Sequence, residues 1–222
     1  MFDVNAPLDP HALAQGQLVL AKLPSLGPGQ SVAGITDHWA VGTYEQTWPD
    51  APLVNGNNDG YHLCVPLRNG LFVAEITADP RLNAIQVGEG APYIAHSAGQ
   101  NSHRLGVAVC AMAGATPEDF GAYPVTEHQL EVMCAINAAL GAKYGLDLTD
   151  LAVLTTHAVD AINMRYFPGD ATDPNYPESG RPYRWDLGRR IASSASLTKV
   201  GAIAECTEYR IRSRAYELKM LG

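Results

Sequence analysis

The stretch Leu105–Met112, LGVAVCAM, is almost continuously apolar. A strand of this composition is typical of the centre of a sheet that is covered on both faces. Earlier in the chain, Tyr61–Leu67 and Leu71–Ile76 flank Arg68-Asn69-Gly70. Because Asn-Gly favours the positive φ angles of a tight hairpin turn, these two runs are predicted to form antiparallel strands.

A helix is predicted after Thr126. Thr126 precedes Gln129 by three residues, the spacing at which each side chain can bind the other residue's free backbone N–H at a helix start. Apolar positions then recur at helical spacing up to a stop at Gly145, at Met133, Ile136, Leu140 and Tyr144. Two further strands are expected, a short one at Gly34–Trp39 and one at Leu151–Thr155 that delivers His157 just past its end.

The chain divides into three parts around one core. We interpret residues 1–33 as an N-terminal arm, in which Ala14–Leu23 could be a strand or a short helix. Residues 34–190 form the main domain, with Pro-, Gly- and Asp-rich loops at 47–60 and 165–183. Residues 191–222 form a C-terminal helical extension. A length of 222 residues fits a single α/β or α+β domain.

Composition excludes several classes of protein. The formal net charge of -8 argues against a nucleic-acid partner, which needs a cationic surface. Apolar runs fall far short of the roughly 20 residues that span a bilayer, so we expect no membrane insertion. Residues 1–10 lack the basic start of a signal peptide, which indicates synthesis in the cytoplasm. The four cysteines form no CxxC pair and are interpreted as buried thiols: Cys64, Cys110, Cys134 and Cys206.

Three separated residues are candidate metal ligands. Hydrolytic zinc sites use three His, Asp, Glu or Cys ligands and leave one position for water. His38 and His157 lie near the ends of predicted strands, and Asp186 follows the long loop. These positions have no compact spacing such as HExxH, so spacing alone does not establish a metal site.

Four blocks in order resemble the N-acetylmuramoyl-L-alanine amidase family, which includes phage lysozyme-type amidases and the animal peptidoglycan-recognition proteins. The first block, ITDHWAVG at 35–42, is similar to the family's first strand with its zinc-binding His. The second, GYHL at 60–63 with the turn at 68–70, is similar to its GYHF strand and hairpin. The other two are AHSAGQNS at 95–102, leading into the central strand, and LTTHA at 154–158, followed by DP at 173–174 and RWDL at 184–187.

The resemblance implies a fold, a reaction and a site. The fold is α/β, with a central mixed sheet of about five or six strands flanked by helices. The reaction is zinc-dependent hydrolysis of the amide bond between the lactyl group of N-acetylmuramic acid and L-alanine of peptidoglycan, as in endolysins and other enzymes of cell-wall degradation. The implied site consists of Zn²⁺ ligands His38, His157 and Asp186, catalytic residues Tyr61 and Arg184, and substrate-binding residues His96 and Asn101.

Tyr61 would orient the attacking water, and Arg184 would stabilise the oxyanion. Asp173, in Asp173-Pro174, is a rival third ligand; Asp186 is favoured because Arg184 stands two residues before it. His62 alternates to the opposite strand face from Tyr61 and is interpreted as structural.

Two other functions are weighed against the amidase. One is a non-catalytic peptidoglycan-binding module of the same fold, which an intact ligand set argues against. The other is a Cys/His hydrolase using Cys64 or Cys110, for which apolar strands are a poor environment. The expected partner is peptidoglycan or a muropeptide, bound by a monomer, with oligomers left open. Without a signal peptide the protein would reach the wall through lysis or a secretion system.

Overall fold

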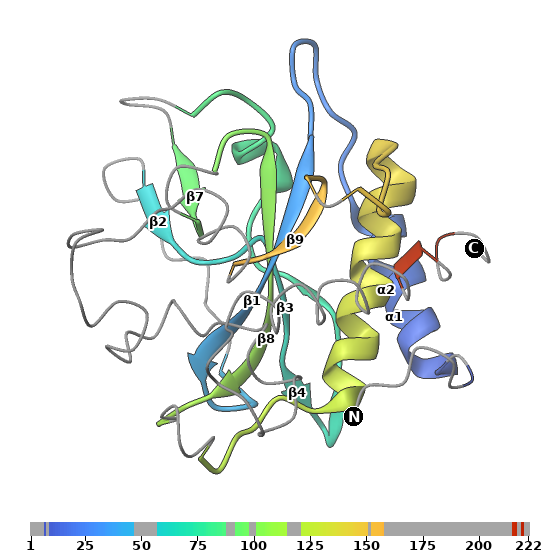
Figure 1. Cartoon of the computed structure of the whole chain (residues 1–222), viewed down its shortest axis with the longest axis vertical. Coiled ribbons are helices and arrows are strands. Elements are labelled where there is room, and N and C mark those ends of the chain that lie inside the picture. The colour runs from blue at the N-terminus through green and yellow to red at the C-terminus, as the bar shows by residue number, and fades with distance from the viewer. Residues whose placement is uncertain are drawn as a thin grey trace.

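A five-stranded mixed sheet forms the centre of the molecule (Figure 1). The computed structural model describes residues 7, 9–46, 57–87, 92–97, 101–114, 121–150, 152–157, 215, 216 and 219. The strand order is β6-β3-β8-β1-β9. The strands are β1 (Gly34–Gly42), β3 (Leu63–Val65), β6 (Glu75–Ile76), β8 (Arg104–Met112) and β9 (Leu154–Thr156). The predicted α/β class with a mixed sheet is confirmed.

The strand predicted from LGVAVCAM is the middle of this sheet. β8 pairs in parallel with β1 on one side and with β3 on the other. β9 adds in parallel to β1, and β6 adds antiparallel to β3. Every residue of β8 is buried, as expected for a strand covered on both faces.

The predicted hairpin is present between β4 (Leu67–Arg68) and β5 (Leu71–Phe72). Its turn residues Asn69 and Gly70 both have positive φ, 50° and 80°, as a two-residue hairpin turn requires. A second small sheet joins β2 (Asn57–Asp59) in parallel to β7 (Tyr93–Ala95). The prediction of a loop over 47–60 is therefore wrong at 57–59, where the backbone bonds to β7.

Two helices lie on one side of the sheet (Figure 1). Helix α2 (Glu127–Tyr144) begins with the predicted capping box of Thr126 and Gln129 and ends at Gly145, whose φ is 71°. The sequence of Ala14–Leu23 allowed either a strand or a short helix. The structure shows a helix, α1 (Pro10–Lys22). A short 3₁₀ helix, η1 (Pro80–Leu82), precedes Asn83.

Helix α1 packs closely against α2. Gly16 allows this approach, since a Cβ there would lie 2.9 Å from the carbonyl oxygen of Ala135. Ala12, Val19 and Leu23 join the main core. The segment interpreted as an N-terminal arm is thus packed into the same core as the sheet.

The described part of the C-terminal segment also touches this core. Residues 215, 216 and 219 are helical, Ala215 is buried, and the Lys219 Nζ donates a 2.6 Å hydrogen bond to the carbonyl of Leu146. The rest of the predicted extension at 191–222 lies outside the described residues. In the part of the chain that is described, no helix is long and apolar enough to cross a bilayer.

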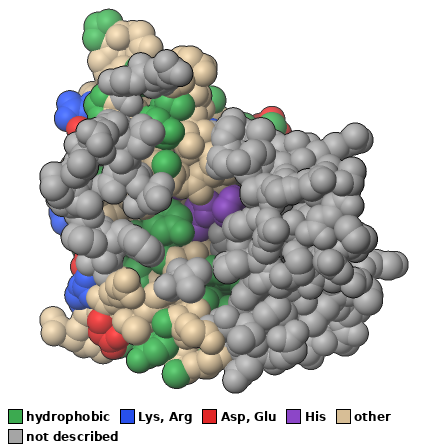
Figure 2. Space-filling view, turned by 90° about the vertical axis from the view of Figure 1, so that its left-hand side faces the viewer, with side chains coloured by type: hydrophobic (Ala, Val, Ile, Leu, Met, Phe, Trp, Pro, Cys, Tyr) green, Lys and Arg blue, Asp and Glu red, His purple; other side chains and the backbone are tan. Residues whose placement is uncertain are grey.

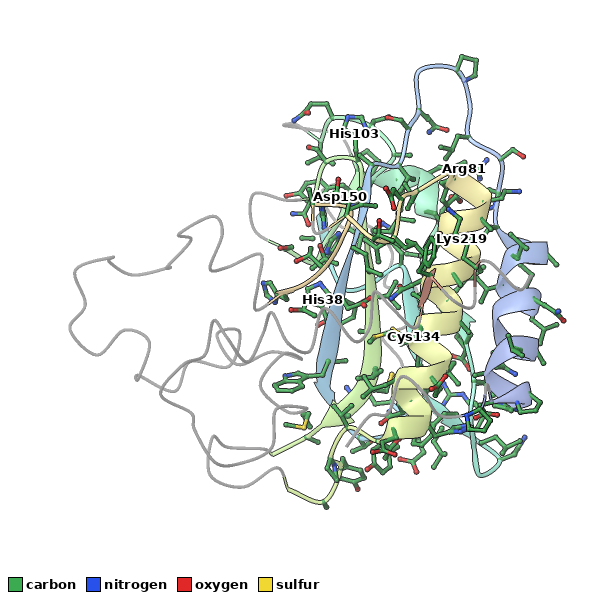
Figure 3. The ribbon with its side chains drawn as sticks, turned by 45° about the vertical axis from the view of Figure 1, so that its right-hand side comes forward. His38, Arg81, His103, Cys134, Asp150 and Lys219 are labelled. Carbon is green, nitrogen blue, oxygen red and sulfur yellow. The ribbon has the colours of Figure 1, made fainter. Side chains whose placement is uncertain are left out.

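The two faces of the sheet differ in their side chains. On β1, Asp37 faces α2, where its carboxylate accepts a 2.8 Å hydrogen bond from Asn137. His38, the next residue, points to the side away from α2 (Figure 3). Small residues cluster on that second face, with Tyr61 against them: Ala40, Cys64, Ala108 and Cys110. The candidate site is therefore built on the sheet face opposite the helices.

Candidate metal centre

The strand register brings His157 next to His38. β1 and β9 pair in parallel with Asp37 opposite Thr156, so the following residues are also lateral neighbours. The two imidazole centroids lie 4.6 Å apart at an interplanar angle of 51°. His38 is not at a strand end as predicted, because β1 runs on to Gly42 beside β8. β9 stops at Thr156, so His157 is the first residue after its strand.

The buried side chain of Arg104 stabilises the pairing of β1 with β9. Its Nη2 donates to the carbonyl of Ile35 at 2.8 Å and its Nε to the hydroxyl of Thr36 at 3.1 Å, both on β1. Its Nη1 donates to the carbonyl of Ala152 at 2.7 Å, just before β9. One guanidinium therefore joins both strands near their amino ends, and its planar fork suits three diverging acceptors.

Tyr61 lies beside His38 in the part of the site that solvent can reach. Its ring centroid lies 5.0 Å from that of His38, at an interplanar angle of 50°. His38 is only 1% exposed, whereas Tyr61 and His157 are half-buried. On the face turned away from the helices, a histidine surface is visible beside hydrophobic side chains (Figure 2). The cluster thus reaches solvent in the part formed by Tyr61 and His157.

His96 adds a third imidazole from the segment after β7. Its ring meets His38 edge to face, with centroids 5.5 Å apart, and its Nε2 donates a 3.2 Å hydrogen bond to the carbonyl of Arg104. The pKa of His96 lies well below 6.5, because burial and the neighbouring His38 disfavour its charged form. His96 is therefore a neutral ring in the site.

Two asparagines hold the segment that carries His96. The Oδ1 of Asn101 accepts the backbone N–H groups of His96 and Ser97, both at 3.0 Å. Asn83 is fully buried and donates from Nδ2 to the carbonyls of Ile94 and Asn101, both at 2.9 Å. In the described structure Asn101 therefore shapes this segment through its side-chain oxygen, while a direct substrate contact stays a prediction.

His62 also packs against this cluster, although strand alternation predicted that it would point to the opposite face from Tyr61. Its ring lies 5.6 Å from that of His96, and Tyr61 lies beside His38. Strand alternation does not separate residues 61 and 62, since β3 begins only at Leu63. Burial lowers the pKa of His62 to about 3, and Asn83 and Asp79 oppose that shift without offsetting it.

Asp186, its rival Asp173 and Arg184 lie outside the described residues. Within the described ranges, no three His, Cys, Asp or Glu side chains are arranged to hold a metal ion. His38 and His157 would therefore need a third donor from another part of the chain. The 4.6 Å between their ring centroids makes these two imidazoles neighbours.

The cysteines of the sheet are poor nucleophiles. Cys64, Cys110 and Cys134 are fully buried, while Cys206 is not among the described residues. A hydrogen bond with Cys64, together with burial, raises the pKa of the Cys110 thiol. Since the thiolate is the reactive form, this environment argues against a Cys/His hydrolase.

The cluster offers imidazole nitrogens for a cation or a proton and a phenol that can donate and accept hydrogen bonds. The motifs pointed to His38, Tyr61, His96 and His157, which the structure brings together. They did not point to Arg104 or Asn83, because no local pattern marks a side chain whose acceptors are backbone groups of distant segments. No protein-family model, curated protein or solved structure matches this chain.

Proposed function

We propose that the chain is a zinc-dependent amidase that cleaves the bond between the lactyl group of N-acetylmuramic acid and L-alanine of the peptidoglycan stem peptide. The observation that carries this proposal is that His38 on β1 and His157, directly after the adjacent parallel strand β9, have ring centroids 4.6 Å apart. The resemblance motifs support it, because residues from all four blocks meet in one cluster.

The donor chemistry fits zinc. His38 and His157 would supply two imidazole ligands, and Asp186, or alternatively Asp173, a carboxylate. A zinc ion bound there would lower the pKa of a coordinated water and polarise the scissile carbonyl. Because His38 is buried and held within β1, one ligand would be fixed before binding.

The other residues act on the water and the substrate. Tyr61 stands beside His38 at the accessible part of the cluster, where its hydroxyl would orient the attacking water. Arg184 would stabilise the negative charge that develops on the carbonyl oxygen. His96 would contact the stem peptide, and Asn101 would serve the same contact by holding the backbone of His96.

The proposed substrate is peptidoglycan or a soluble muropeptide. An acidic protein with a net charge of -8 is not suited to nucleic acid. We further propose that the enzyme acts as a monomer on the cell wall.

The decisive experiment combines metal analysis with product analysis. The purified chain is incubated with peptidoglycan and with defined muropeptides, in the presence of zinc or a chelator. Mass spectrometry should detect free stem peptides beginning with alanine, and only with zinc. The variants His38→Ala and His157→Ala should each lose bound zinc and activity.

His128→Ala is the matched control, because this half-buried histidine lies on α2 with its Nδ1 2.7 Å from a carboxylate oxygen of Asp9 instead of joining the cluster. It should keep both zinc and activity. Cleavage between sugars would contradict the proposal. So would binding of peptidoglycan without any cleavage by the zinc-loaded chain, which would favour a recognition module.

A further inference from the structure

The hydrogen bonds of His96 fix its tautomer. A carbonyl oxygen only accepts, so the 3.2 Å contact with Arg104 requires the proton on Nε2. Nδ1 therefore carries a lone pair. This atom is buried, and no described residue forms a hydrogen bond with it. The residue itself is 8% exposed. A buried acceptor of this kind is costly unless a further group donates to it.

The sheet fixes the position of this ring. A Cβ at Gly106 would lie 2.6 Å from Cγ and 3.1 Å from Cδ2 of His96, so the ring rests directly on the strand backbone. Nδ1 and Cδ2 are on opposite sides of Cγ in an imidazole. With Cδ2 against Gly106, Nδ1 occupies the other edge of the ring.

His62 supports the ring of His96 from one side. Its Nδ1 accepts the N–H of Gly106 at 3.0 Å, and its backbone N–H donates to the Gly106 carbonyl at 2.9 Å. His62 is fully buried, and its ring meets that of His96 at 77°. His96 in turn meets His38 at 84°. The rings of His62, His96 and His38 thus pack one against the next, and His38 is a candidate metal ligand.

We propose that His62 is a positioning residue that holds the ring of His96 against the Arg104 carbonyl, which keeps the proton on Nε2, so that Nδ1 accepts a hydrogen bond from a peptide N–H of the substrate. This inference rests on the proposed amidase function for the identity of the donor. Stem peptides offer backbone N–H groups, and a preorganised acceptor loses little freedom on binding. His62 itself would touch neither substrate nor metal.

Two variants separate the ring of His62 from its hydrogen bond. In His62→Asn the amide oxygen can still accept the Gly106 N–H, but the ring against His96 is gone. In His62→Phe a ring remains, but the acceptor for Gly106 is lost. If the ring positions His96, His62→Asn should lower kcat/KM roughly 10- to 100-fold, as expected for residues that orient a site from behind. Thermal unfolding of both variants shows whether they fold.

A double-mutant cycle tests whether His62 acts through His96. In a His96→Ala background, His62→Asn should change kcat/KM by less than about twofold, because the group it positions is already absent. A loss of the same size in both backgrounds would overturn the proposal, since it would show that His62 acts elsewhere.

A second readout needs no activity. In ¹⁵N-histidine spectra of the metal-free wild-type protein, His96 should be the Nε2–H tautomer, and His62→Asn should convert it to a mixture. An Nδ1–H tautomer in the wild type, or an unchanged His96 signal in the variant, would overturn the inference. An inactive wild-type enzyme with the expected spectra would refute the amidase function and its peptide donor, but not the positioning of His96 by His62.

Discussion

Gly106 of β8 lies directly under the imidazole of His96, so that a Cβ at position 106 would be 2.6 Å from Cγ of the ring. Real Cβ atoms do not approach this closely, and β8 is buried between its neighbours and cannot retreat. We therefore expect Gly106→Ala to displace His96, lower the free energy of unfolding by about 1–3 kcal/mol and reduce amidase activity. Chemical denaturation and turnover of a muropeptide measure the two effects.

Gly60→Ala is the matched control, because a Cβ at position 60 meets no atom within 4 Å although Tyr61 is the next residue. It should leave both stability and activity close to the wild type. Equal effects of the two substitutions would show that the contact between Gly106 and His96 is not the cause.

The hydrogen bonds of the Arg104 guanidinium to Ile35, Thr36 and Ala152 lead to a second prediction. Arg104→Lys keeps the charge but cannot reach Ile35, Thr36 and Ala152 with one ammonium group. The loss should cost about 2 kcal/mol or more and loosen β9 against β1. Because β9 delivers His157, zinc affinity should fall as well, as metal titration would show.

Arg81→Lys is the control for this substitution. Arg81 pairs with Asp79 on the surface, and its side chain is 51% exposed. The change should leave both the free energy of unfolding and the zinc affinity close to those of the wild type, because an exposed ion pair contributes little to stability. If Arg104→Lys were equally mild, Arg104 would not be what holds β9 in register.

The sequence predicted elements whose cause is local. The Thr126 capping box, the Asn69-Gly70 turn and the apolar run of β8 each depend on neighbouring residues, and all three are confirmed. The apolar pattern of Ala14–Leu23 alone fits either a strand or a helix, whereas Asp9 and Pro10 form a helix start in which the Asp9 side chain accepts the N–H of His11.

Features that depend on distant pairing were less predictable. The alternation rule wrongly placed Tyr61 and His62 on opposite faces, because it assumes that a strand already exists at residue 61, and β3 begins at Leu63. The extension of β1 past Trp39 depends on pairing with 110–112, which no local pattern reveals. Asn83 and Arg104 bind backbone groups of remote segments, so only the fold identifies their roles.

Thiol chemistry provides a third prediction. Cys64 and Cys110 are fully buried, and the pKa of Cys110 is raised by its hydrogen bond with Cys64 and by burial. In a Cys206→Ser background, an alkylating reagent should leave the folded protein active and modify the thiols only after unfolding. A chelator should abolish activity. Activity that is lost together with alkylation of folded Cys64 or Cys110 would instead support a thiol mechanism.

The buried histidines predict the pH dependence of stability. Burial lowers the pKa of His62 from 6.5 to about 3 in the folded protein. Between these values the unfolded chain binds a proton at His62 that the folded protein does not bind. Stability should therefore be complete above pH 6.5 and fall as the pH decreases towards 3, by at most about 1.4 kcal/mol per pH unit for this group. Burial also lowers the pKa of His96, so this residue too should make the free energy of unfolding fall as the pH decreases.

His62→Asn isolates the contribution of one group, because Asn does not titrate and can still accept the Gly106 N–H. We expect the free energy of unfolding of the wild type to fall by up to about 2 kcal/mol more than that of His62→Asn between pH 6.5 and 5. Urea denaturation in chelator-containing buffers measures both curves without metal. Parallel curves would mean that His62 takes up its proton equally in the folded and unfolded chain, and that water reaches its ring in the native protein.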